Sequence, residues 1–178
     1  EGMGESSHAG GAGPAAASDA GGVPSEVLVH LDGVVHRVAY AKGESLLQAA
    51  RRAGLGAPFA CEEGYCGSCP VLVNDAATRS CRMSIKEVQD KEVVTIEGLE
   101  KDGKLHPLQK AFIEHDAMQC GFCIPGQVLN GVSLLHRNPY PSTDEILRVM
   151  NRHLCLCGAH PLIVQAIQTA AAEMKGAR

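Results

Sequence analysis

The sequence predicts an α+β fold, in which a small β-grasp unit is followed by a bundle of four helices. Two observations support this prediction. Between residues 26 and 96, apolar residues alternate with other residues, as they do in half-buried strands. Beyond Gly98, apolar residues recur at helical spacing instead. The chain has 178 residues, enough for two small domains, and we expect these domains at residues 25–100 and 101–178.

The N-terminal half is expected to hold a tail, four strands and one helix. Residues 1–24 are mostly Gly, Ala, Ser and Pro and offer little to bury, so we expect a flexible tail there. Asp32-Gly33 predicts a hairpin turn between the first two strands. An amphipathic helix is expected from Ser45 to Ala53, ending at Gly54. The four predicted strands cover residues 27–31, 34–40, 70–73 and 93–96.

The C-terminal half reads as four helices joined by short links, which favours a bundle. Ser142-Thr-Asp-Glu145 has the pattern of a capping box, which predicts a helix start. The charged segment Lys101–Lys104, which contains a glycine, is the expected domain boundary. The predicted helices cover residues 107–117, 125–136, 142–153 and 162–174.

All eight cysteines fall into two groups of four. The first group follows C-x4-C-x2-C-x11-C, which is the plant-type [2Fe–2S] spacing, and a [2Fe–2S] cluster uses four thiolates. Gly64 and Gly67 permit the positive φ angles that a loop needs to wrap around a cluster. We therefore predict one [2Fe–2S] cluster per group. The first cysteine group is Cys61, Cys66, Cys69 and Cys81, and the second is Cys120, Cys123, Cys155 and Cys157.

The second cysteine group is less specific, because its pattern is C-x2-C-x31-C-x-C. Its members precede the helix starts at Pro125 and at His160-Pro161, where the helix dipole favours a negatively charged sulfur. Taken alone, this group also fits zinc or redox disulfides. Zinc fits the spacing of the first group poorly. A disulfide scaffold ranks last, because the cysteines cluster at metal-ligand spacing.

Composition excludes several functions. The net charge is −4, and no segment is basic enough to favour nucleic acid or an anionic membrane surface. Three Phe, three Tyr and no Trp make a weak core, so bound clusters are expected to supply part of the folding free energy. No nucleophile–base pair or nucleotide-binding loop occurs, so no catalytic residue is expected. The scattered histidines are interpreted as surface or core residues: His30, His36, His106, His115, His136 and His153.

With these motifs in order, the chain resembles the small iron–sulfur subunit of the molybdenum hydroxylases, the family of xanthine dehydrogenase, carbon monoxide dehydrogenase and isoquinoline oxidoreductase. The resemblance covers about residues 25–178 and rests on segments 61–69, 119–126 and 154–157. It implies a plant-type ferredoxin-like domain and a four-helix domain, each with one [2Fe–2S] cluster. It also implies that Gln119 touches the pterin of a molybdopterin cofactor, which a partner subunit holds, and that Cys157 lies close to it.

The resemblance implies an electron-transfer subunit without substrate chemistry of its own. Such a subunit relays electrons from the molybdenum centre of a large molybdopterin-binding subunit to an acceptor. The acceptor is FAD on a flavin subunit or haem on a cytochrome c-type subunit. Many members have Cys-Arg-Cys-Thr-Gly-Tyr where this chain has residues 155–160, and Gly158-Ala159-His160 is nearer to the cytochrome-linked isoquinoline and nicotinate branch. A free-standing ferredoxin-type shuttle and a non-redox module with two zinc ions stay as alternatives.

Sequence signals for location are few. No run of 18 or more apolar residues occurs, so no transmembrane segment is expected. The start lacks the basic and apolar regions of a signal peptide. We expect a cytoplasmic setting, where clusters are assembled. A periplasmic or membrane-associated location through partners stays open, because the chain begins at Glu1 rather than Met.

Overall fold

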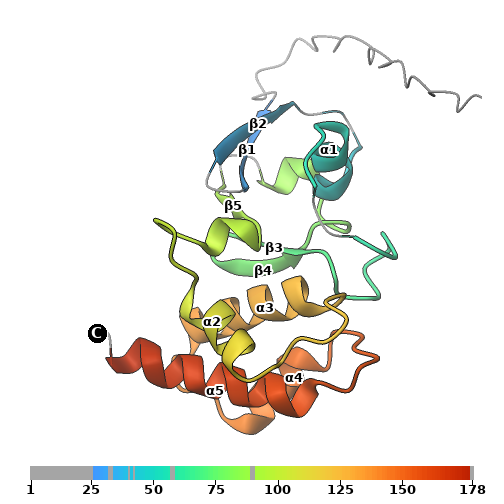
Figure 1. Cartoon of the computed structure of the whole chain (residues 1–178). Coiled ribbons are helices and arrows are strands. Elements are labelled where there is room, and N and C mark those ends of the chain that lie inside the picture. Colours follow the sequence, from blue (N-terminus) through green and yellow to red (C-terminus); the bar gives the residue numbers. More distant parts are fainter. Residues whose placement is uncertain are drawn as a thin grey trace, which may run out of the picture.

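The computed structural model describes residues 26–31, 34–39, 41, 43–56, 59–88 and 91–176. The predicted tail at residues 1–24 and the predicted turn at Asp32-Gly33 lie outside these residues. In Figure 1, the strands lie in the upper half and the C-terminal helices lie in the lower half. The α+β class predicted from the sequence is confirmed.

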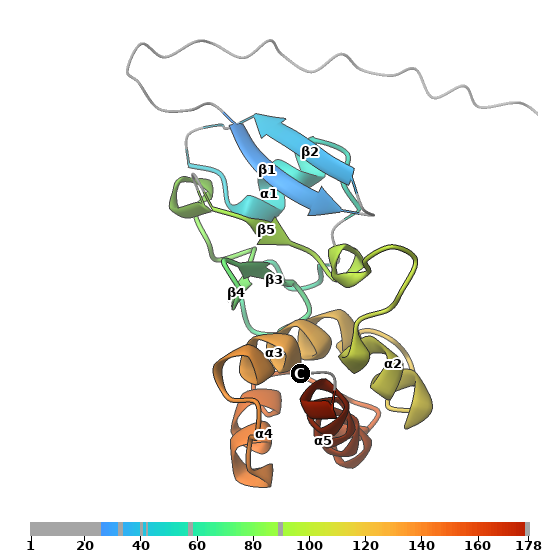
Figure 2. The ribbon, with the colours of Figure 1, turned by 90° about the vertical axis from the view of Figure 1, so that its left-hand side faces the viewer.

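The five strands form one mixed sheet in the order β2-β1-β5-β3-β4. β1 is parallel to β5, and the other neighbours are antiparallel. Figure 2 shows the sheet descending from β2 towards α3. The strands are β1 (Glu26–Leu31), β2 (Val34–Ala39), β3 (Pro70–Val73), β4 (Ala76–Arg79) and β5 (Val93–Val94).

Two features of the sheet differ from the sequence prediction. β4 was not expected, because Ala-Ala-Thr-Arg lacks a clear alternation of apolar residues. It pairs with β3 across Asn74 and Asp75, whose positive φ angles of 46° and 65° are those of a tight hairpin turn. β5 ends at Val94, before the predicted Ile96, and a 3-10 turn, η2 (Glu97–Leu99), follows it.

The helix α1 (Leu46–Arg52) confirms the amphipathic helix predicted at 45–53. Ser45 caps its N-terminus: Ser45 Oγ accepts from the Gln48 N–H, and Gln48 Oε1 accepts from the Ser45 N–H. The chain then turns at Gly54, which has a φ of 76°. A short 3-10 helix, η1 (Ile85–Val88), which the sequence analysis did not predict, packs against α1.

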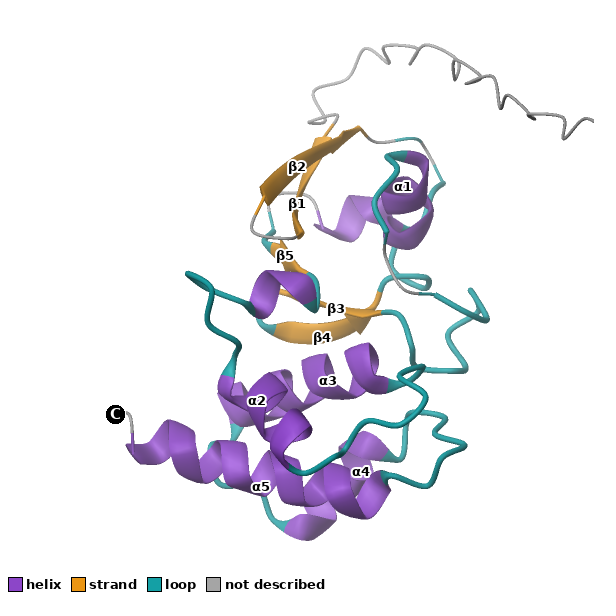
Figure 3. Ribbon diagram, in the orientation of Figure 1, coloured by secondary structure: helices purple, strands orange, loops and turns teal. Residues whose placement is uncertain are grey.

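The four predicted C-terminal helices are present (Figure 3). The capping box expected at α4 is only half formed. Ser142 Oγ accepts from the Glu145 N–H, but the Glu145 carboxylate accepts from Asn138 Nδ2 at 2.8 Å instead. α4 also ends earlier than predicted, three residues before His153. The helices are α2 (Pro107–Glu114), α3 (Ile124–Arg137), α4 (Thr143–Met150) and α5 (His160–Gly176).

The sheet lies between α1 on one face and α3 on the other, and strand β3 shows why. Val71 and Val73 belong to the core that includes α1, whereas Leu72 belongs to the core of the C-terminal helices. Successive side chains of a strand point to opposite faces, so β3 is apolar throughout because both faces are covered. Leu99 also lies in the helical core. The domain boundary at residue 100 therefore stays a prediction.

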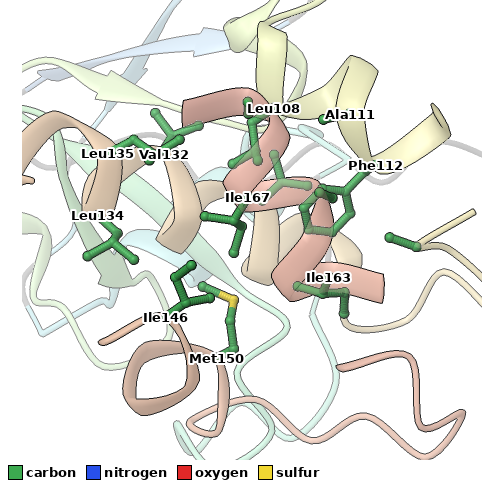
Figure 4. Close-up of a cluster of buried hydrophobic side chains, with 14 of the residues drawn as sticks. Leu108, Ala111, Phe112, Val132, Leu134, Leu135, Ile146, Met150, Ile163 and Ile167 are labelled. Atoms are coloured by element: carbon green, nitrogen blue, oxygen red, sulfur yellow. The ribbon is translucent and has the colours of Figure 1, made fainter. Parts of the chain in front are cut away.

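The helical core is filled by large apolar side chains that point towards one another in Figure 4. Leu108 and Phe112 come from α2, Met150 from α4, and Ile163 and Ile167 from α5, and all are fully buried. That the four helices form a bundle of standard geometry stays a prediction. None of the described helices is long and apolar enough to cross a membrane.

Candidate metal centres

Three members of the first cysteine group, Cys61, Cys66 and Cys69, lie on the loop that leads into β3, and Cys81 follows β4. This loop turns sharply, with positive φ at Glu62, Gly64 and Gly67. The turns aim backbone N–H groups at sulfur: those of Tyr65 and Cys66 lie 3.3 Å and 3.4 Å from Cys61 Sγ. This arrangement is the one expected of a loop that wraps around an anionic group.

The four sulfurs of the first group lie in two adjoining pairs. Cys69 Sγ is 3.1 Å from Cys81 Sγ, and the thiols of Cys61 and Cys66 interact with each other. The β3–β4 hairpin brings Cys81 back to Cys69, and Ser80 fastens it by donating both its N–H and its Oγ–H to the Cys69 carbonyl. The hairpin therefore explains how the fourth cysteine joins the other three.

The second cysteine group also forms two pairs. The Cys120 thiol interacts with that of Cys157, and the Cys123 thiol interacts with that of Cys155. Cys123 is the N-cap residue of α3, and Cys155 and Cys157 lie in the turn before α5. The prediction that the cysteines of this group precede the starts of two helices is therefore confirmed.

The pKa values of the thiols are shifted in both directions. Backbone N–H groups, with that of Cys66 foremost, lower the pKa of Cys61 to about 6. The Phe122 N–H lowers the pKa of Cys120. Burial raises the pKa of the half-buried Cys81 to about 12 and that of the buried Cys123 to about 11. The thiols of Cys81 and Cys123 thus need a nearby positive charge to ionise, and a bound metal supplies one.

The pairwise arrangement fits a binuclear iron–sulfur cluster, because a [2Fe–2S] cluster spreads its four thiolates over two irons.

The two cysteine groups are joined by direct contacts (Figure 3, the loops before β3 and α5). The Leu154 N–H donates to the Cys66 carbonyl at 3.1 Å, and His153 Nδ1 lies 2.8 Å from the Gly67 carbonyl oxygen. Gly126 packs against the same carbonyl so closely that an added Cβ would overlap it. Burial lowers the pKa of His153 to about 4, so this histidine is neutral near pH 7. Sequence reasoning interpreted it only as a surface or core residue.

The residues around the second group are exposed and apolar. Leu156 is 89% exposed, and Met118, Phe122 and Leu154 are about half exposed. Met118 lies two residues before Cys120, and the other three are each adjacent to a cysteine of the group in sequence. We call these four residues the apolar rim. Gln119 is exposed beside Cys120, and Cys157 is partly exposed. The residues assigned to a pterin contact by resemblance therefore lie at the surface.

Sequence reasoning missed Gln127, which is fully buried on α3. Its Nε2 lies 3.0 Å from Cys123 Sγ. The one available signal was its position four residues after Cys123, which places both side chains on one face of a helix.

A cavity of about 480 Å³ opens beside the cysteines rather than over them. It lies between the β4 region and the segment around Arg152. Its lining includes Arg79, Arg82 and Arg152. None of these three arginines forms an ion pair with a carboxylate in the described part of the chain.

The fold and the two cysteine sites define a class of protein that binds two iron–sulfur clusters. Comparisons with known proteins agree. Residues 29–98 match the 2Fe-2S iron-sulfur cluster binding domain, and residues 95–168 match the [2Fe-2S] binding domain. The chain is 42% identical to the alpha subunit of isoquinoline 1-oxidoreductase from Brevundimonas diminuta, over 66% of this chain and 77% of that subunit.

Two further comparisons extend this result. The chain is 38% identical to the small subunit of nicotine 6-hydroxylase from Paenarthrobacter nicotinovorans, over 67% of this chain and 72% of that subunit. It superposes on a chain of quinoline 2-oxidoreductase from Pseudomonas putida with a TM-score of 0.75 and 35% identity, over 85% of this chain and 96% of that one. The chain belongs to the family of small iron–sulfur subunits of molybdenum hydroxylases.

Proposed function

We propose that this chain is the electron-transfer subunit of a molybdopterin-dependent hydroxylase or dehydrogenase. It relays electrons from a molybdenum centre on a partner subunit to a flavin or cytochrome acceptor. The observation that supports this proposal best is the direct contact between two cysteine sites, each of which holds its sulfurs in pairs. A chain built to pass electrons between two centres needs both centres held at a fixed separation.

The ligands of the first cluster are Cys61, Cys66, Cys69 and Cys81, and those of the second are Cys120, Cys123, Cys155 and Cys157. A bound [2Fe–2S] cluster supplies one-electron chemistry at a potential that its surroundings adjust. The chain's own contribution is to hold and orient the thiolates. It also donates hydrogen bonds to sulfur and excludes water from the buried members. The four helices form the bundle that carries the second site.

The fixed separation follows from the contacts between the two loops. The Leu154 N–H, one residue before Cys155, donates directly to the carbonyl of Cys66. Leu154 lies next to a proposed ligand of the second cluster, and Cys66 is itself a proposed ligand of the first. The backbone around one site is thus hydrogen-bonded to the backbone around the other, without an intervening side chain. A flexible two-domain shuttle would lack such a contact.

The molybdopterin-binding partner docks at the apolar rim. Soluble proteins rarely leave large apolar side chains exposed in one contiguous area unless a partner covers them. The rim residues lie within two positions of the cysteines of the second group in sequence and are exposed, so a partner bound there reaches the second site first. Gln119 then faces the pterin, as the family resemblance implies. The acceptor, FAD or haem, receives electrons from the first site.

The decisive test is native purification of this chain from its source, with metal analysis and a visible spectrum. Co-purifying molybdenum with flavin supports a three-subunit flavin-linked enzyme, and molybdenum with haem supports the cytochrome-linked form. Iron without molybdenum or a large partner would instead support a free-standing ferredoxin-type shuttle. A colourless protein with zinc would support the non-redox module, because iron–sulfur protein is red-brown and bleaches with dithionite.

Docking at the rim is tested by Phe122→Asp and Leu156→Asp. Both variants should keep the visible spectrum of the two clusters and lose co-purification of the large subunit. Val34→Asp is the matched control, because Val34 is about as exposed as Phe122 but lies on strand β2. Retention of the partner by both rim variants would rule out this surface. Gln119→Ala should impair turnover with both clusters intact, and normal turnover would argue against the pterin contact.

A further inference from the structure

We propose that the side-chain amide of Gln127 raises the reduction potential of the second cluster, and of that cluster alone, by donating a hydrogen bond to Cys123 Sγ. This inference rests on the ligand assignment of the proposed function. Gln127 Nε2 lies 3.0 Å from Cys123 Sγ, and the side chain has no exposed surface. Gln127 is thus a positioning residue of the site.

The helix fixes this contact. Gln127 follows Cys123 by four residues, and the Gln127 N–H donates to the Cys123 carbonyl at 3.0 Å as part of the first turn of α3. Residues four apart lie on the same face of a helix, so the amide is directed at the sulfur. Gly126, pressed against the Gly67 carbonyl, holds this turn in place. The sulfur and its donor therefore keep their separation.

The orientation of the amide follows from the chemistry of the sulfur. An iron-bound thiolate carries no proton and only accepts hydrogen bonds, so the N–H side of the amide must face it. Gln127 Oε1 is then buried and has no hydrogen-bond partner in the described part of the chain. Its neighbours Val128 and Leu129 are buried apolar residues. An apolar side chain would avoid the cost of this unpaired oxygen, so the bond to sulfur is the feature that accounts for a glutamine here.

The effect on the potential has a definite sign. Negative charge at the sulfurs increases when an electron arrives, and an N–H dipole stabilises that charge most where water is excluded. The bond therefore raises the reduction potential. Among the described residues, the sulfurs of the first cysteine group accept hydrogen bonds from backbone N–H groups, and Ser68 Oγ lies beside Cys66 Sγ. No side-chain amide in the described part of the chain donates to them. Removing the Gln127 amide should leave the first cluster unchanged.

The test is a redox titration of the purified complex, followed by electron paramagnetic resonance, with the first cluster as internal reference. Gln127→Leu and Gln127→Met should both shift the potential of the second cluster downwards, because neither side chain donates a hydrogen bond to the sulfur. Gln168→Leu is the matched control, since Gln168 is exposed on α5 and contacts Thr143. Unchanged potentials in both Gln127 variants would overturn the inference, and so would equal shifts of both clusters.

A second measurement uses only the wild-type protein, so it does not depend on whether a variant folds. Wild-type protein labelled with 15N in the glutamine side-chain amides should show a nitrogen hyperfine coupling on the reduced second cluster. Lack of this coupling on an intact second cluster overturns the inference and leaves the proposed function standing. Lack of iron–sulfur clusters in the wild-type complex overturns the proposed function itself.

Discussion

His153 Nδ1 lies 2.8 Å from the carbonyl oxygen of Gly67, although the two residues are 86 positions apart. A carbonyl only accepts hydrogen bonds, so Nδ1 carries the proton. His153 stands two residues before Cys155, and Gly67 stands one residue after Cys66. This bond therefore joins the two cysteine sites from within the protein interior, and it explains why a buried histidine occurs between them.

The first prediction concerns this bond. His153→Phe keeps a ring of similar size but leaves the Gly67 carbonyl without its donor, which should lower the free energy of unfolding by about 1–3 kcal/mol. His153→Asn carries an amide N–H near the position of Nδ1 and should recover part of the loss. Urea unfolding of the cluster-loaded protein measures both. Equal stability of the Phe variant and the wild type would show that the bond contributes nothing.

A second prediction concerns the close approach of α3 to the first cysteine loop. In Gly126→Ala, the added methyl group overlaps the Gly67 carbonyl, so the helix and the loop must separate. We expect a net loss of about 1–3 kcal/mol, as in other overpacked sites, in spite of the better helix propensity of alanine. Gly56→Ala is the control, because a methyl group there meets no atom within 4 Å. A fully stable Gly126→Ala protein with both clusters would contradict the observed packing.

The third prediction is a pH dependence. Burial, together with the charges of His136 and Lys101, lowers the pKa of His106 from 6.5 to about 4. Its ring accepts from the Leu108 N–H and caps α2, so the folded state favours the neutral form. This contribution to stability is complete above pH 6.5 and is lost as the pH falls from there towards 4, because the unfolded chain binds the proton first.

His106→Asn tests this dependence, because asparagine also caps helices but does not titrate. Stability should be measured by denaturant unfolding at several pH values. Between pH 7 and 5, the variant should lose less stability than the wild type, and the difference between them isolates His106 from the acid sensitivity of the clusters. Parallel stability curves for the two proteins would mean that His106 does not titrate in this range.

The fourth prediction concerns removal of iron. The core has few aromatic residues, and without metal the thiols of Cys81 and Cys123 stay protonated at neutral pH. A chelator should therefore loosen the fold, and reconstitution with iron and sulfide should restore it. The NMR amide spectrum reports this change. A well-dispersed spectrum of the metal-free chain would show that the fold does not depend on its clusters.

Local features of the fold could be predicted from the sequence. The helix predicted from Ser45 to Ala53 and the start of α5 at His160-Pro161 depend on residues close together in the chain, so they are visible in the sequence. β4 was missed because Ala76–Arg79 forms a strand only through its pairing with β3. The partner of Glu145 was missed for a related reason: Asn138 competes for the carboxylate from seven residues away.

The sequence by itself determined the α+β class, the two groups of four cysteines and the family, because cysteine spacing and apolar periodicity are properties of the chain. Only the tertiary structure decided how the sulfurs pair, that His153 and Leu154 join the two sites, and that Gln127 faces Cys123. These relationships depend on which backbone groups meet after the β3–β4 hairpin and α3 have packed. Such contacts bring together residues far apart in the sequence, and local residue patterns do not specify them.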